Sequence, residues 1–455
     1  DPKYLDLTNL NSNNNSISIS ISTTSNFLSS IISEINQQGY PFAKASLKNI
    51  STNNNELTAN LVIDLHKERK IDKVIVKGYE EFPRKFIQHY LNIEIGSPLK
   101  TDDIKIASKN LNSLAFASEL KSPEILFAND STTVYLYIEK LKNNSFDGLL
   151  GFSTNESGKL ELNGYLDLQL TNIFNKGESF SIKWKGNGNE RTSFDLALST
   201  PFIFNSPVSP SASLNIYKQD STFINIKAQI NATYLLNPRN SITAQFKTEN
   251  SNNLLENNSN IQNFDEFKST LYGINYTFNK TDLTFQNSPI FFGSIGLLFG
   301  NRTSEINSFD DNQQKIESEI YYNWFLNRNN SIYTRNTGGI LFSETYLINE
   351  LFRIGGTNTI RGFDEESILS SFYNITNLEY HYYLNTDSYV YSITDFALTQ
   401  NKALNLDSKL YSFGLGYSYG TKNGVIDISY AMGKIENIPF DLNNSRFHIK
   451  FVQFF

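Results

Sequence analysis

The chain has 455 residues, of which 39% are hydrophobic, 14% aromatic and 19% charged, and its formal net charge is −7. It contains no cysteine, so a disulfide framework, a zinc–cysteine site and a cysteine nucleophile are all excluded. Because the charge balance is acidic and the few histidines lie far apart, we expect no nucleic-acid partner, no metal site and no other cofactor.

The sequence does not predict a membrane-spanning helix. No stretch approaches the ~18 consecutive apolar residues that such a helix needs. The nearest run, from Pro289 to Gly300, is interrupted by serine and glycine. The chain begins at Asp1 without a charged and apolar leader, and we expect that a signal peptide has been removed.

Residues 1–144 mix helical and strand patterns. Apolar residues at helical spacing predict one helix, capped by Ser25 and ended by Gly39, with strands near 43–50 and 57–66 after it. A fuller unit follows, with a strand at 70–77, a helix after Pro83, a helix at 101–114, and strands at 119–127 and 133–140. This β-α-α-β-β order predicts a small α+β core.

From about residue 145 onward the hydrophobic period is two, the period of a half-buried strand. The clearest run places apolar side chains on one face and polar ones on the other: Leu160, Leu162, Leu166, Leu168 and Leu170. Several strands run to roughly 10–14 residues, which exceeds the usual strand of a soluble sandwich and crosses a bilayer at a tilt. We therefore predict a transmembrane antiparallel β-barrel over residues 145–455, with an all-β secreted or surface-adhesive domain as the alternative.

Counting the alternating segments gives about sixteen strands, an even number as such barrels require. Expected strand starts include Phe267, Ile316 and Phe372. With this count the longest connections (250–265, 301–313 and 343–368) all fall on one side of the barrel, and short turns such as 237–240, 327–330 and 385–387 fall on the other. If residues 1–144 are periplasmic, the long connections face outward.

The first and last strands are expected to meet at a seam. In the last strand one face carries Phe447, Ile449, Phe451 and Phe455, with His448 and Lys450 on the other. A terminal phenylalanine resembles the signal read by the machinery that assembles outer-membrane barrels, and it also fits an interfacial girdle anchor. In the first strand, Gly148 and Gly151 weaken packing, so a seam that opens sideways is predicted; glycine that accommodates barrel curvature is the alternative.

Two segments of the amino-terminal region resemble POTRA repeats, the periplasmic units of the outer-membrane assembly and translocation family of BamA/TamA and two-partner-secretion transporter type. They are Val74-Ile75-Val76-Lys77-Gly78 with Ile95-Gly96-Ser97-Pro98-Leu99, and Gly39-Tyr40-Pro41-Phe42-Ala43. The resemblance implies a truncated or divergent repeat at 1–68, a second repeat at 69–144 and a barrel of about sixteen strands at 145–455.

The long connection at 343–368 carries a second part of the resemblance. Ile360, Arg361, Gly362 and Phe363 resemble the Val/Ile-Arg-Gly-Phe/Tyr motif that this family folds back into the barrel lumen. Residues 393–397 resemble its Phe-x-Asp-x-Gly pattern, with Ala397 in the glycine position. Since a desolvated arginine needs an anion, we predict that Arg361 bridges Glu379 and Asp395 and pins the loop in the lumen; three unrelated solvated charges are the alternative.

The resemblance implies an outer-membrane polypeptide insertase or translocase that binds its client by β-strand addition to POTRA edges. The implied partners are unfolded outer-membrane or secreted client proteins, outer-membrane lipids and accessory lipoproteins. A two-partner-type secretion pore and, from a different class, a passive porin-like channel are the alternatives. No Gly-x-Ser-x-Gly elbow, phosphate loop or His-Glu-x-x-His motif occurs, so we expect no enzyme.

Overall fold

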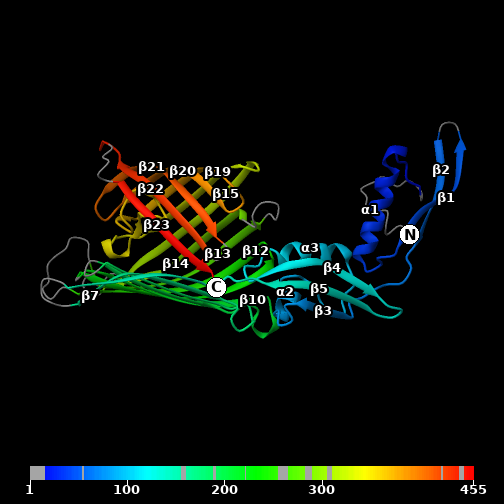
Figure 1. Ribbon diagram of the computed structural model, residues 1–455, viewed down its shortest axis with the longest axis horizontal. Helices are drawn as coiled ribbons and strands as arrows, with labels where there is room; N and C mark the ends of the chain where they lie inside the picture. Colours follow the sequence, from blue (N-terminus) through cyan, green and yellow to red (C-terminus); the bar gives the residue numbers. More distant parts are fainter. Residues whose placement is uncertain are drawn as a thin grey trace. The chain divides into compact units, whose positions relative to one another are not determined.

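The computed structural model divides into two compact units, Asp1–Lys140 and Leu141–Phe455 (Figure 1). It describes residues 16–53, 56–154, 160–187, 191–220, 222–254, 265–281, 289–304, 310–421, 424–439 and 445–454.

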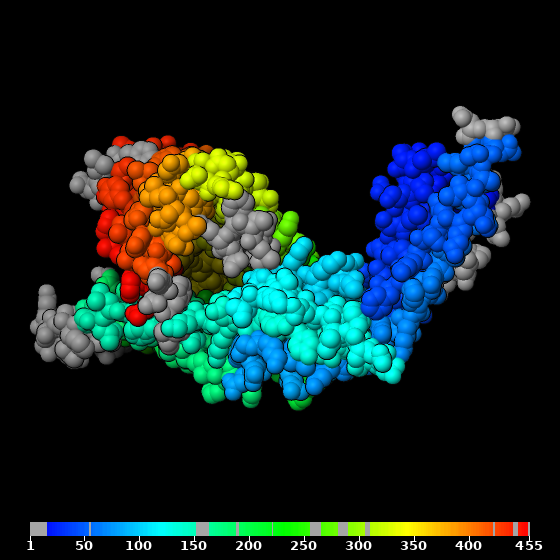
Figure 2. Space-filling view, turned by 45° about the vertical axis from the view of Figure 1, so that its right-hand side comes forward, coloured from blue at the N-terminus to red at the C-terminus, as the bar shows by residue number. Residues whose placement is uncertain are grey.

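The first unit begins with a helix packed on a β-hairpin (Figure 2). A 3₁₀ turn (Ile21–Thr23) leads into α1 (Thr24–Gln37), and β1 (Lys44–Asn53) pairs with β2 (Glu56–Asp64). Ile31 and Ile35 of α1 are buried against the hairpin. Gly39 follows the helix with φ +94°, the left-handed conformation that ends it. The prediction that Ser25 caps the helix is wrong, because the 3₁₀ turn places Thr23 at the cap position and Ser25 inside the first turn.

The rest of the first unit contains β3 (Lys73–Gly78), α2 (Arg84–His89), α3 (Thr101–Leu111), β4 (Ala117–Phe127) and β5 (Thr132–Lys140). The three strands form one sheet in the order β3-β5-β4, with β3 parallel and β4 antiparallel to the central β5. Its buried residues include alternate residues of β5 and one face of α3: Val134, Leu136, Ile138, Ile104, Ala107 and Leu111. The assignment of these elements to POTRA repeats stays a prediction. In the parts of the chain that the structure describes, no helix is long and apolar enough to cross a membrane.

The second unit is a closed antiparallel barrel of sixteen strands, which confirms the predicted architecture and strand number (Figure 1). The strands are β6 Ser145–Thr154, β7 Leu160–Thr171, β8 Ser179–Asn187, β9 Arg191–Ser199, β10 Val208–Gln219, β11 Phe223–Asn237, β12 Asn240–Asn253, β13 Phe267–Thr281, β14 Pro289–Ser304, β15 Asp310–Asn327, β16 Asn330–Phe342, β19 Phe372–Tyr383, β20 Ser388–Asn401, β21 Leu406–Thr421, β22 Gly424–Ile435 and β23 Ser445–Phe454.

The strand starts lie close to the expected ones, except that β15 begins at Asp310 rather than near Ile316. Its first residues are polar, and alternate ones are buried toward the lumen: Asp311, Gln313 and Lys315. Because the inside of a barrel accepts polar side chains, this polar segment extends the strand instead of interrupting it.

The seam between β23 and β6 is joined at one end. Within the described residues, the register pairs Gln453 with Phe146 and Phe454 with Ser145, whereas β22 and β23 pair continuously from Gly424↔Gln453 to Met432↔Ser445. The predicted seam residues Phe447, Ile449 and Phe451 are exposed on the outer face of β23, and Gly148 and Gly151 lie on β6. Phe455 lies outside the described residues.

Candidate functional site

The connection between β16 and β19 forms the candidate site. It contains a 3₁₀ turn, η5 (Ile348–Glu350), and two short strands, β17 (Phe352–Ile354) and β18 (Ile368–Ser370), which pair antiparallel. The two legs of the loop therefore lie side by side, with the Arg361 motif between them. The loop buries Ile354 and Ile360 against wall residues of β19, β20 and β21: Ile375, Ala397 and Leu410. This apolar contact holds the loop against the inside of the barrel.

Arg361 lies between two carboxylates on adjacent wall strands. It is 8% exposed; its Nε donates to Asp395 Oδ2 at 2.9 Å and its Nη2 to Asp395 Oδ1 at 2.6 Å, while Nη1 donates to Glu379. The backbone N–H of Arg361 also donates to Asp395 Oδ2 at 3.0 Å. The structure thus brings the three predicted residues together, with a two-pronged contact to Asp395 that only a guanidinium can make. Their role in transport stays a prediction.

Alternation along β19 and β20 explains why both carboxylates face Arg361. Leu378 and Tyr380 are exposed on the outer face, whereas Glu379 and His381 face inward, and His381 Nε2 lies 2.6 Å from Glu379 Oε2. On β20 the inward residues are buried, including Asp395. Glu379 therefore has both Arg361 and His381 as partners.

The two residues after Arg361 fit closely against the wall. Gly362 has φ +79°, and a Cβ at this position would collide with the backbone nitrogen of Gly433 on β22. Phe363 packs against the cluster around Ile354 and Ile360. Glycine is therefore required at 362 both by its backbone conformation and by the close approach of β22.

We expect Gly362→Ala to lift the motif from the wall, because a left-handed backbone strained by about 1–3 kcal/mol is combined with a steric collision. The reporter is Ala397→Cys, the sole thiol of the chain and buried beneath the loop. Its labelling by a maleimide should accelerate by about tenfold or more. Gly293→Ala, where a Cβ meets only the Phe291 side chain at 3.4 Å, is the control. Equal labelling in both variants would contradict the expected effect.

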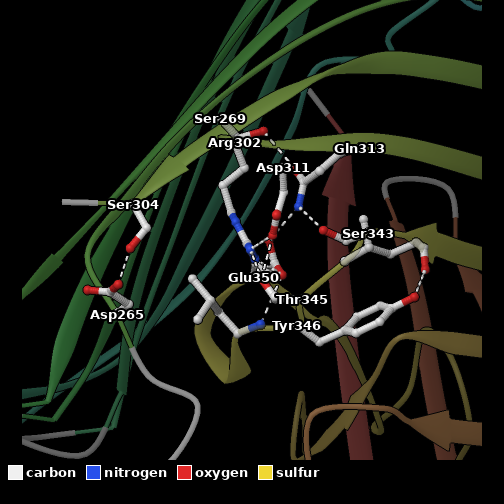
Figure 3. A network of polar contacts seen from close by, with 12 residues as sticks. Asp265, Ser269, Arg302, Ser304, Asp311, Gln313, Ser343, Thr345, Tyr346 and Glu350 are labelled. Atoms are coloured by element: carbon white, nitrogen blue, oxygen red, sulfur yellow. Dashed lines mark hydrogen bonds and ion pairs between the residues drawn. The ribbon is translucent and has the colours of Figure 1, made fainter. Parts of the chain in front are cut away.

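A second polar network holds the base of the same loop (Figure 3). Arg302 of β14 is 2% exposed and donates to Asp311 of β15, to Glu350 of η5 and to Thr345. Gln313 Nε2 donates to the other oxygen of Glu350 at 2.7 Å. Figure 3 shows these side chains converging from two wall strands and from the loop. The sequence reasoning missed this site; the available signal was an arginine at an inward position of a barrel strand, which requires an anion nearby.

The loop also reaches the wall formed by β10, β11 and β12. Asn349 Nδ2 donates to Ser251 Oγ at 2.7 Å, and Asn225 Nδ2 donates to the backbone oxygen of Asn349 at 2.6 Å. The Arg353 guanidinium lies 3.6 Å from the ring centroid of Tyr217, a cation–π contact. Loop contacts are therefore distributed around the lumen instead of being confined to the Arg361 motif.

Comparison with known proteins identifies the fold. No protein-family model and no curated protein matches the chain. Among solved structures, CdiB from Acinetobacter baumannii matches with a TM-score of 0.63 at 13% identity, covering 96% of this chain and 82% of that one. CdiB from Escherichia coli matches with a TM-score of 0.60 at 13% identity, covering 96% and 85%. BamA from Haemophilus ducreyi lacking POTRA domains 1-3 is 15% identical over 96% and 94%, with a TM-score of 0.49.

The likeness to CdiB and the closed sixteen-strand barrel agree with the predicted resemblance at the level of the fold. The chain shares the fold of CdiB. At this identity the likeness concerns the fold and leaves the activity to be argued from the site.

Proposed function

We propose that this chain is an outer-membrane polypeptide insertase or translocase, with residues 1–144 in the periplasm. The observation that carries the proposal is a loop pinned inside a barrel whose first and last strands pair, within the described residues, through Gln453↔Phe146 and Phe454↔Ser145. A passive porin requires an open aqueous lumen. A pinned loop and a weakly paired seam fit a barrel that changes conformation when a client passes.

Client capture is supported by the sheet of the first unit. β4 is an edge strand, so its free backbone groups can accept an added strand by main-chain hydrogen bonding. Pro123 removes one donor from this edge, which leaves the segment 124–127 as the better template. Leu126 of this segment is 55% exposed and lies beside the position where a client would bind.

A photo-crosslinker at Leu126 of the full chain tests the proposal in cells. Capture of several unfolded barrel precursors, with accessory lipoproteins among the co-purified proteins, would support insertion. Capture of one secreted protein would favour the two-partner-type secretion pore. No capture, together with ion conductance that persists without residues 1–144, would overturn the proposal in favour of a passive porin-like channel. A probe at Ile106, an exposed residue of α3 and not of the edge strand β4, is the control.

We expect a disulfide between Phe146→Cys and Gln453→Cys to stop client insertion under oxidising conditions, because it locks the register pair that closes the seam. The chain has no native cysteine, so the introduced pair is the only one. Insertion should return on reduction. The control, Val425→Cys with Val452→Cys, joins β22 to β23 without crossing the seam and should leave insertion unchanged. Full insertion by the oxidised seam pair would instead indicate a route through the lumen.

A further inference from the structure

The segment 362–365, at the tip of the lumen loop, contacts strands on both sides of the seam. The strand order around this part of the barrel is β22-β23-β6-β7-β8-β9, with the seam between β23 and β6. Gly362 lies against Gly433 of β22 on one side. The next residues of the loop contact β23 on that side, and β8 and β9 on the other.

On the β23 side the contact is a two-pronged ion pair. Arg446 Nε donates to Asp364 Oδ1 at 2.8 Å, and Arg446 Nη2 donates to Asp364 Oδ2 at 3.1 Å. Arg446 is the second residue of β23, whereas the register pairs with β6 involve Gln453 and Phe454 at its other end. The loop therefore holds β23 at the end where its pairing with β6 is absent from the described register.

On the other side, Glu365 makes two contacts. Arg191 Nη1, at the start of β9, donates to the backbone oxygen of Glu365 at 2.9 Å. Lys185 Nζ of β8 lies 3.9 Å from Glu365 Oε2. Two consecutive loop residues thus connect β23 to β8 and β9 across the inner side of β6 and β7.

We propose that Asp364 and Glu365 form a clasp that keeps the seam closed at the end opposite to its backbone pairs. Arg361 fixes the position of the clasp, since its buried contacts with Glu379 and Asp395 anchor the loop three residues away. The clasp itself is releasable. The Asp364 side chain is 63% exposed, and ion pairs of this kind are weak in water. Backbone pairing at one end and a loop-mediated clasp at the other allow the seam to open from the clasp end. The importance of this opening for transport rests on the proposed function. The existence of the clasp does not depend on that function.

The clasp is tested by measuring distances between β6 and β23 across the seam. Leu150→Cys on β6 and Ile449→Cys on β23, both exposed, carry spin labels in the full chain reconstituted in phospholipid vesicles without client. We expect Asp364→Arg, which repels Arg446, to raise the population of long inter-label distances about two- to fivefold. The charge swap Asp364→Arg with Arg446→Asp should restore the original distribution. Glu344→Ala, an exposed acid in the same loop, is the control and should leave the distances unchanged.

An unchanged distance distribution in Asp364→Arg would overturn the clasp, and so would a charge swap that fails to restore it. Arg191→Ala adds a second measurement from the other side of the seam and should shift the distances in the same direction. Because these measurements need no client, a failed clasp is distinct from a failed proposed function, which the Leu126 probe reports.

Discussion

Arg361→Met is expected to release the tip of the lumen loop from the barrel wall. Methionine keeps most of the apolar packing of the arginine stem but removes the only guanidinium between Asp395, which is 1% exposed, and Glu379. Breaking a buried ion pair by removing one partner costs about 3–5 kcal/mol, because the remaining charge stays desolvated. His381 remains beside Glu379, so most of the effect arises at Asp395.

The measurement is the labelling rate of Ala397→Cys in vesicles. A loss of this size should accelerate labelling by about two to three orders of magnitude. Arg361→Lys should lie between wild type and Arg361→Met, since an ammonium retains the charge but cannot bind Asp395 with two donors. Arg239→Met, in an exposed turn between β11 and β12, controls for the loss of an arginine. Labelling of the Met variant at the wild-type rate would show that the ion pairs do not hold the loop.

The partners of Arg361 could be predicted from two different signals: the family resemblance supplies the lumen position of the loop and Asp395, and alternation supplies Glu379. On β20 the alternation is poor, because the inward face that carries Asp395 also carries Tyr391 and Ile393, so the prediction of Asp395 depends on the likeness of residues 393–397 to the Phe-x-Asp-x-Gly pattern. For Glu379 the signal is alternation along β19, which places Glu379 and His381 on the face opposite to Leu378 and Tyr380. The barrel itself was predictable for the same reason, since a period of two sustained over long strands identifies both its faces.

The Arg302 network could not be predicted in the same way. Its acid, Glu350, lies in a 3₁₀ turn of a long connection, and no periodicity indicates where such a turn will lie. The Asp364–Arg446 pair joins residues 82 positions apart through the path of the same loop. Ionic contacts between a loop and a wall depend on the tertiary course of the loop, which hydrophobic alternation does not encode.

Arg302→Met is expected to release the base of the loop. The change leaves Glu350 and Asp311, both buried, without their shared cation. The expected cost is again about 3–5 kcal/mol, because the two carboxylates must then be hydrated or take up protons. The reporter here is Ala403→Cys, which is buried with Leu341 and Leu351 beneath the base of the loop. Lys268→Met, an exposed cation on β13, is the control.

The triple variant Arg302→Met, Asp311→Asn, Glu350→Gln separates charge from packing. Replacing a buried ion network with uncharged side chains often changes the stability of a protein little. Labelling of Ala403→Cys should therefore return toward the wild-type rate. If Ala403→Cys is labelled as fast in the triple variant as in Arg302→Met, the loop is released by the loss of side-chain packing and not by unpaired buried charge.

Combining Arg302→Met with Arg361→Met shows whether the base and the tip of the loop are held independently. Additive effects at Ala403→Cys and Ala397→Cys mean two separate anchors, whereas a larger combined effect means that the loop leaves the lumen as one body.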